Sequence, residues 1–169
     1  MALPQPQFTL EPLTSAHAEE MYAVLSDPAI YLYIEDTPPT SVDHVQAWFT
    51  KLEARRSPDG AELWLNWVVR DAAGQATGYV QATVLAPHTA FVAYVFASAH
   101  WGRGLAKAAM GRMLRLLADE FGVEQFRAVA DRRNTRSVRL LQSLGFELAE
   151  RQPEATGDVA YSLSSTRIE

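Results

Sequence analysis

The most informative segment of the sequence is Trp101-Gly102-Arg103-Gly104-Leu105-Ala106. Its two glycines lack a Cβ atom, so the backbone can turn tightly there and direct successive amide N–H groups into one concavity. The segment also opens the longest amphipathic run of the chain, and the N-terminus of a helix carries partial positive charge. A nest of amides in this position suits an anion, and a pyrophosphate in particular.

Two better-known phosphate motifs do not fit these residues. A dinucleotide-binding fingerprint would need a third glycine where Lys107 stands, and a P-loop would need Gly-Lys followed by Ser or Thr. Taken alone, the segment is equally compatible with a glycine-rich start of a helix that binds no ligand.

The residues after the glycines predict the strongest helix of the chain. Leu105, Ala109, Met113 and Leu117 recur at helical spacing, and Gly122 follows them as a stop signal. Beyond this helix over 105–121, the pattern predicts a strand, a short helix ended by Gly145, and two further strands, over 126–131, 134–144, 146–151 and 159–163.

The residues before the glycines predict an antiparallel meander, because apolar residues alternate with turn residues between the runs, over 62–70, 78–85 and 90–97. The pattern nearer the N-terminus predicts a strand over 7–13 and then two helices. Thr14 or Ser15 suits the start of the first helix, Asp27-Pro28 its end, and Ser41 the start of the second, which Ser57-Pro58-Asp59-Gly60 closes.

The predicted order of elements is therefore βααβββαβαββ. Only the strand–helix–strand unit of 90–131 needs a parallel crossover. The expected fold class is α+β, with a mixed, mostly antiparallel sheet and four helices. The chain has 169 residues, a length that predicts a single domain spanning 1–169.

The composition excludes several classes of function. Asp and Glu outnumber Lys and Arg by 20 to 15 without a long basic run, so nucleic-acid binding is not expected. The absence of cysteine excludes disulfides, thiolate metal sites and thiol nucleophiles, and the histidines lack metal-ligand spacing, so no metal is expected. No apolar run approaches the ~20 residues that cross a bilayer, and the N-terminus lacks a signal-peptide pattern. We therefore expect a soluble cytoplasmic protein that does not bind membranes.

A second motif, Asn134-Thr135-Arg136-Ser137, lies further along the chain and is followed by the pair Gly145-Phe146. The two motifs, in this order and at this separation, resemble those of the GNAT superfamily of acetyl-CoA-dependent N-acetyltransferases. The cofactor loop of that family reads Gln/Arg-x-x-Gly-x-Gly/Ala, and its later helix reads Asn-x-x-Ser/Ala followed by Gly-Phe. Gly104 and Ala106 match the loop, whereas Trp101 departs from the usual Gln or Arg.

A looser resemblance points to one branch of this family. The segment Leu25-Ser26-Asp27-Pro28-Ala29-Ile30-Tyr31, and the closing Gly-Phe-Glu with Tyr161-Ser162-Leu163, are similar to the branch that acetylates the N-terminal amines of ribosomal proteins.

The resemblance implies a fold with splayed central strands and a site for acetyl-CoA between them. The pantetheine arm would bind along the strand before the loop, where Phe96 is the matching residue. The end of that strand, from Tyr94 to Ala97, would donate a backbone N–H to the thioester oxygen. Asn134 would bind the pantetheine or phosphate arm, although its residue type also suits a helix N-cap. The pyrophosphate would bind the amides of the loop: Gly102, Arg103, Gly104, Leu105 and Ala106.

The resemblance also implies a catalytic residue. Many members of the family place a tyrosine four residues before the glycine of Gly-Phe to protonate the leaving thiolate, and this chain has Leu141 there. The ribosomal-protein branch commonly uses the serine of Asn-x-x-Ser instead, which makes Ser137 the expected catalytic residue. The other interpretation is that Ser137 satisfies a free backbone amide at the start of its helix. The residues do not identify a general base, for which the candidates are Glu35, Asp36, Gln81 and Tyr94.

The predicted function is transfer of an acetyl group from acetyl-CoA to a primary amine by direct attack. A peptide or protein N-terminus, with a pKa of about 8, loses its proton more readily than a lysine-like amine with a pKa of about 10.4, and a small amine is the other candidate acceptor. The irregular segments 31–40 and 86–89 are expected to select the acceptor. The alternative function is a non-catalytic module that holds CoA or another phosphate ligand. A monomer or a homodimer is expected.

Overall fold

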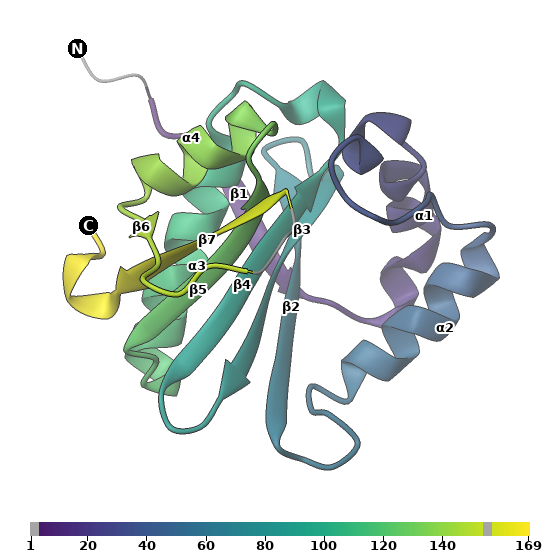
Figure 1. Cartoon of the computed structure of the whole chain (residues 1–169). Helices are drawn as coiled ribbons and strands as arrows, with labels where there is room; N and C mark the ends of the chain where they lie inside the picture. The colour runs from purple at the N-terminus through teal and green to yellow at the C-terminus, as the bar shows by residue number, and fades with distance from the viewer. Residues whose placement is uncertain (1–3, 154–156) are drawn as a thin grey trace.

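A computed structural model describes residues 4–153 and 157–169 of the chain, which form one sheet and the helices that cover it (Figure 1). The sheet has 7 strands in the order β1-β2-β3-β4-β5-β7-β6. Adjacent strands are antiparallel except for β4 and β5, which are parallel. The bounds are β1 Phe8–Pro12, β2 Glu62–Asp71, β3 Ala76–Leu85, β4 Thr89–Phe96, β5 Gln125–Asp131, β6 Glu147–Leu148 and β7 Asp158–Ser164. The predicted mixed, mostly antiparallel α+β fold, and its order of elements, are confirmed.

Helices cover both faces of the sheet and create two hydrophobic cores. The helices α1 (Ala18–Leu25) and α2 (Val42–Glu53) pack on one face, whereas α3 (Leu105–Phe121) and α4 (Thr135–Ser143) pack on the other (Figure 1). Strand β2 shows why both faces are covered. Trp67 and Val69 are buried on the α3 side, and Val68 between them is buried on the α1 side. None of the helices in the described ranges is long and apolar enough to cross a membrane.

Local sequence signals set most helix ends. The Ser41 hydroxyl accepts a hydrogen bond from the His44 amide at 3.1 Å, as expected of an N-cap. Helix α1 ends before Asp27-Pro28, and Gly122 ends α3 in the left-handed conformation, with φ 65°. The first predicted helix differs from expectation at its start, where Ser15–His17 form a 3₁₀ turn, η1, capped reciprocally by Thr14 and His17.

The predicted strand over 146–151 is wrong beyond Leu148. The side chain of Gln152 explains the early end, because its amide group occupies the edge of β7 in place of another strand residue. The Gln152 Nε2 donates to the Ala160 carbonyl at 2.9 Å, and its Oε1 accepts from the Ala160 amide at 2.9 Å. Because the Gln152 side chain satisfies both the carbonyl and the amide of Ala160, β6 does not continue to that position of β7.

An ion-pair network fixes α1 against the sheet. Arg70 on β2 binds Glu11 on β1 at 2.7 Å and Glu20 on α1 at 2.5 Å. The hydrogen bonds from Arg70 hold the pKa of both carboxyl groups below their usual value. Glu11 also contacts the His17 imidazole at 2.9 Å. The segment that follows α1 therefore starts from a fixed position.

The central strands splay apart. Strand β4 pairs with β3 along its whole length, up to Phe96 opposite Gly78. Its parallel pairing with β5 covers only Thr89 to Phe91, opposite Gln125 to Arg127. Beyond these residues the two strands diverge, and this confirms the splayed central strands that the family resemblance implied.

Candidate active site

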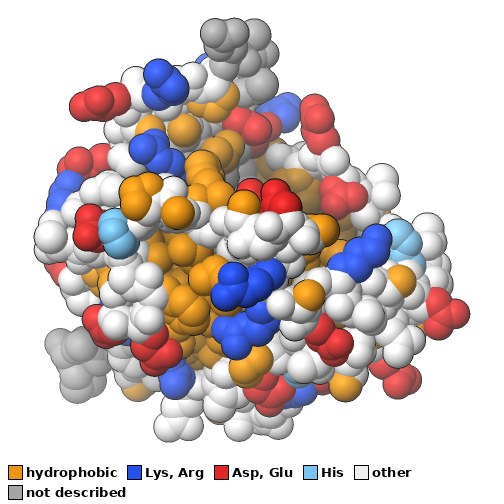
Figure 2. All heavy atoms as spheres, turned by 90° about the horizontal axis from the view of Figure 1, so that it is seen from below, with side chains coloured by type: hydrophobic (Ala, Val, Ile, Leu, Met, Phe, Trp, Pro, Cys, Tyr) orange, Lys and Arg blue, Asp and Glu red, His pale blue; other side chains and the backbone are white. Residues whose placement is uncertain are grey.

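The divergence of β4 and β5 opens a cavity of about 1190 Å³. Its walls come from the segment after α1, the ends of β4 and β5, the loop before α3, and the first turns of α3 and α4. The predicted site residues that line it are Phe96, Gly102, Gly104, Leu105, Ala106, Asn134 and Ser137. Arg103 is exposed and does not line the cavity. The surface seen from below is hollowed, and hydrophobic side chains are exposed in the hollow (Figure 2).

The glycine loop has the backbone geometry of an anion nest. Gly102 and Gly104 have φ values of 74° and 75°, which lie in the left-handed region that disfavours other residues. A Cβ atom at either position would meet nothing within 4 Å, so the backbone conformation and not packing requires glycine. Gly104 is the N-cap of α3 and offers no side-chain hydrogen bond to the first turn. The amides at the start of α3 are therefore available to a ligand.

Trp101 holds this loop against the end of β4. Its Nε1 donates to the Phe96 carbonyl at 2.9 Å. On the other side, the guanidinium carbon of Arg136, in the first turn of α4, lies 3.8 Å from the centre of a Trp101 ring. The indole thus connects three parts of the cavity wall.

The backbone of β4 presents an edge to the cavity. The Ala97 amide donates to the Thr77 carbonyl at 3.1 Å, on the β3 side. Backbone groups alternate in direction along a strand, so the amides of Tyr94 and Phe96 face away from β3 and toward the gap. Because β5 pairs with β4 only up to Phe91, this edge can accept an extended ligand.

Two hydroxyl groups meet across the gap. The Tyr94 Oη on β4 and the Ser137 Oγ on α4 lie 2.6 Å apart. Burial raises the pKa of the Tyr94 hydroxyl above its usual value, although Ser137 and the charge of Arg136 act in the opposite direction. The phenol is therefore protonated at neutral pH.

The cap at the start of α4 is Asn134. Its Oδ1 accepts a hydrogen bond from the Ser137 amide at 3.2 Å, so the expected N-cap role of Asn134 is confirmed. Among the described residues, the hydroxyl partner of Ser137 is Tyr94, and no backbone amide donates to it. This contact favours the catalytic interpretation of Ser137, which stays a prediction.

Asp27 also positions the loop, although the sequence suggested only that it ends a helix. One carboxylate oxygen accepts from the Ala29 amide at 3.0 Å, and the other accepts from the Ser98 amide at 2.6 Å. Hydrogen bonds from Ser98 hold the pKa of Asp27 below its usual value. This contact ties the end of α1 to the turn before Trp101. An Asp-Pro pair after a helix is the signal that identified the residue, but its partner is distant in sequence.

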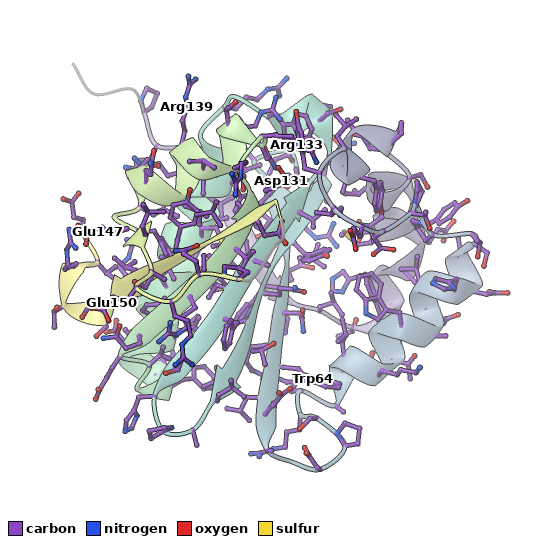
Figure 3. All side chains as sticks on the ribbon, viewed as in Figure 1. Trp64, Asp131, Arg133, Arg139, Glu147 and Glu150 are labelled. Carbon is purple, nitrogen blue, oxygen red and sulfur yellow. The ribbon has the colours of Figure 1, made fainter. Side chains whose placement is uncertain are left out.

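A charged bridge spans the upper end of the sheet, where Asp131 and Arg133 lie close together (Figure 3). The Arg133 Nη2 lies 2.8 Å from the buried Asp131 carboxylate, and its guanidinium carbon lies 5.8 Å from the centre of the Tyr33 ring. The hydrogen bonds from Arg133 lower the pKa of Asp131 to about 2. The end of β5 is thereby connected to the segment after α1.

The two segments expected to select the acceptor lie in different places. Residues 32–35 line the cavity, and Leu32 and Ile34 are exposed there. Residues 86–89 do not line it, because they form the hairpin at the end of β4 that is paired with β5. In that hairpin, the His88 carbonyl accepts from the Glu124 amide at 2.8 Å. The expectation for 86–89 is therefore wrong.

Three of the four candidates for a general base lie in the cavity wall. Glu35, Gln81 and Tyr94 line the cavity, whereas Asp36 does not.

Comparison with known proteins identifies this arrangement. A family profile described as an acetyltransferase (GNAT) domain matches residues 7–147. The chain belongs to the GNAT acetyltransferase family. It is thus an acetyl-CoA-dependent N-acetyltransferase, as the two motifs predicted.

Solved structures of other acetyltransferases share the fold. A spermidine N-acetyltransferase from Vibrio cholerae, in complex with CoA and spermine, superimposes with a TM-score of 0.78 at 19% identity, covering 96% of this chain and 98% of that one. A GNAT acetyltransferase from Bacillus anthracis gives 0.77 at 15% identity, covering 98% and 99%. An acetyltransferase from Thermus thermophilus gives 0.74 at 21% identity, covering 97% and 99%. No curated protein sequence matches this GNAT chain.

Proposed function

We propose that this GNAT enzyme acetylates a primary amine by direct attack on acetyl-CoA, and that its acceptor is the N-terminus of a peptide or protein. The observation that carries the proposal is the meeting of three features in one cavity. These are an amide nest at α3, an unpaired edge of β4 and a hydroxyl pair across the gap. The looser resemblance to the ribosomal-protein branch favours the N-terminal acceptor.

The residues in the cavity fit acetyl-CoA. The amides of residues 102–106, which include Arg103 and Leu105, would hold the pyrophosphate, because the start of α3 has no side-chain cap. The edge of β4 at Phe96 would hold the pantetheine arm by strand-like hydrogen bonds. The side-chain NH₂ of Asn134 can donate to that arm while its Oδ1 caps α4.

The chemistry requires two actions from the chain. The acceptor amine, once deprotonated, attacks the acetyl carbon, and the carbon–sulfur bond breaks with the electron pair passing to sulfur. The Tyr94 backbone amide faces the gap and would stabilise the charge that develops on the carbonyl oxygen. Ser137 would donate a hydrogen bond, and then a proton, to the departing sulfur. The proton that the attacking nitrogen loses on becoming an amide would restore the Ser137 hydroxyl, directly or through water.

The hydroxyl pair suits this role of Ser137. A phenol is a stronger acid than an alcohol, so we take the Tyr94 hydroxyl as the donor and the Ser137 Oγ as the acceptor in their 2.6 Å contact. The Ser137 proton is then free to point into the cavity. Tyr94 is thus a positioning residue that acts through Ser137.

Ser137→Ala is expected to lower kcat about 10-fold, with little change in acetyl-CoA affinity or melting temperature. The effect is moderate because a thiol of pKa about 8.5 is already a fair leaving group. The stability is preserved because Asn134, and not Ser137, caps α4. Steady-state kinetics, calorimetry and thermal melting test the three expectations. Tyr94→Phe should lower kcat in the wild type but not in the Ser137→Ala background. A variant that melts lower but turns over normally would contradict the assignment.

The segment after α1 is expected to control acceptor binding. Replacing residues 32–35 with Gly and Ser should raise the acceptor KM about 10-fold and change the acetyl-CoA KM much less. Tyr31 stays in place because its hydroxyl donates to the Leu25 carbonyl at 2.7 Å and fixes the segment. The control is the same replacement at 86–88, which does not line the cavity and should change neither KM. Equal changes in both KM values would count against this expectation.

An acetylation assay tests the proposed function directly. The panel holds peptides with different N-terminal residues, free amino acids and polyamines, the last because the Vibrio cholerae relative was solved with spermine. Acetylation of peptides above the other amines supports the proposal, and preference for polyamines overturns the proposed acceptor. Binding of acetyl-CoA without transfer to any amine would favour the non-catalytic module.

A further inference from the structure

We propose that Arg136, stacked on Trp101, binds the pyrophosphate of acetyl-CoA and supplies the cationic side chain of the phosphate site from α4. The inference rests on the proposed function and adds to it a ligand from a second helix.

The position of Arg136 is fixed by the loop that forms the nest. Its guanidinium carbon lies 3.8 Å from the centre of a Trp101 ring, which is the separation of a tight cation–π stack. Trp101 is itself fixed, because its Nε1 donates to the Phe96 carbonyl at 2.9 Å. The guanidinium is therefore held beside the first residue of the glycine loop, and it lines the same cavity as Gly102 and Gly104.

The charge of Arg136 is available to a ligand. Within residues 4–153 and 157–169, no carboxylate forms an ion pair with its guanidinium. Arg133 provides the contrast, because its guanidinium already binds the Asp131 carboxylate at 2.8 Å. Arg103, the cation within the loop, is exposed and does not line the cavity. The loop thus offers amides but no cation to this space, and Arg136 provides one.

The contact with Trp101 also leaves N–H groups of the Arg136 guanidinium free to bind a phosphate. A guanidinium that lies over the face of an indole keeps N–H groups that can reach the oxygens of a phosphate. Since the stack has already ordered the side chain, little further rotamer entropy is lost when the phosphate binds. Lys107 and Arg139 also line the cavity, but no aromatic ring holds either of them in the described residues.

The test is calorimetric binding of three ligands that differ in their phosphates. CoA carries a pyrophosphate and a 3′-phosphate, dephospho-CoA keeps only the pyrophosphate, and pantetheine has neither. Arg136→Ala should weaken the binding of CoA and of dephospho-CoA to the same extent, by roughly 10- to 100-fold. This is the change in affinity that the loss of a charge-assisted hydrogen bond produces. Pantetheine, measured by displacement, should bind the variant and the wild type equally. Arg136→Gln, which keeps the length of the side chain, should behave like Arg136→Ala.

The control is Arg132→Ala, which removes the same charge from the same segment but outside the cavity. It should change the affinity for all three ligands less than about 3-fold, because exposed charges at a distance are screened. Arg136→Lys should lose part of the affinity, because it keeps the charge but not the planar fork.

Four results would overturn the inference. If Arg136→Ala loses as much affinity for pantetheine as for the other two ligands, Arg136 only supports the fold of α4. If it loses affinity for CoA alone, Arg136 binds the 3′-phosphate. If Arg132→Ala loses as much CoA affinity as Arg136→Ala, net charge alone matters. If Arg136→Ala binds CoA as tightly as the wild type, Arg136 does not contact the pyrophosphate. A wild type that binds none of the three ligands would instead refute the proposed function, and this inference would fall with it.

Discussion

Gly104→Val is expected to reduce acetyl-CoA binding by more than about 100-fold while the chain remains folded. Gly104 has φ 75°, and a non-glycine residue in the left-handed region costs roughly 1–2 kcal/mol, with β-branched residues the least tolerated. The loop can relieve this strain by changing conformation, and its amides then no longer converge on one point. A Cβ at position 104 would also meet no protein atom within 4 Å, so the valine side chain would occupy open space beside the amides that are proposed to hold the pyrophosphate. Calorimetry with acetyl-CoA measures the loss.

Gly122→Val is the matched control, because it places the same side chain in the same conformation at the other end of α3. Gly122 has φ 65°, and a Cβ there also meets nothing within 4 Å. The two variants should lose similar thermal stability, but only Gly104→Val should lose the ligand. If Gly104→Val binds acetyl-CoA as tightly as Gly122→Val does, the glycine spacing has nothing to do with the cofactor.

Both glycines illustrate why so much of the fold could be predicted from the sequence. Gly122 ends α3 and Ser41 starts α2 through interactions within a few residues, which the local sequence specifies. The alternation of apolar residues in β2 likewise reflects burial on each face of the sheet. The glycine loop could also be predicted from the local sequence, because its glycines stand between a predicted strand and a predicted helix, where a phosphate-binding turn is expected.

The contacts that build the cavity depend on pairings that local patterns do not contain. Tyr94 and Ser137 are 43 residues apart, and they meet only because β4 separates from β5 where α4 begins. One signal was present, since Val92, Tyr94 and Phe96 alternate along one strand and would share a face. That face is the one covered by α3 and α4. The strand pattern predicts the face on which Tyr94 lies, but the helix that covers this face and the partner Ser137 required the structure.

Gln152 shows the opposite case, in which a side chain replaces a backbone interaction. The apolar residues from Phe146 to Ala149 continue a strand pattern, and no local signal predicts that an amide side chain will occupy the edge of β7. Competition between side chain and backbone for the same partner is decided by tertiary contacts. For this reason the length of β6 could not be read from the sequence.

Gly78→Ala is expected to destabilise the enzyme by about 3 kcal/mol and to disturb the edge of β4 that is proposed to bind pantetheine. A Cβ at position 78 would lie 2.1 Å from the Val95 carbonyl oxygen and 2.8 Å from the Phe96 Cα. Both atoms belong to the backbone of the neighbouring strand, so no rotation of a side chain can relieve the overlap. The end of β4 must move away from β3, and the strand edge at Phe96 moves with it. A melting temperature lower by roughly 6–12 °C follows for a domain of this size, and CoA affinity should fall as well.

Gly111→Ala in α3 separates this effect from the general cost of replacing a glycine. A Cβ at position 111 would lie 3.7 Å from the Arg115 Nη1 and 3.8 Å from the Leu144 Cδ2, which are ordinary contacts. Alanine also favours a helix over glycine by about 1 kcal/mol, so this variant should melt roughly 2–4 °C higher than the wild type and bind CoA normally. The same one-carbon addition therefore has opposite signs at the two positions, because one meets the backbone of β4 and the other fits beside two side chains. If Gly78→Ala melts like Gly111→Ala, then the close approach of β3 and β4 does not hold the strand edge in place, and the shape of the pantetheine site must be set from the β5 side of the gap.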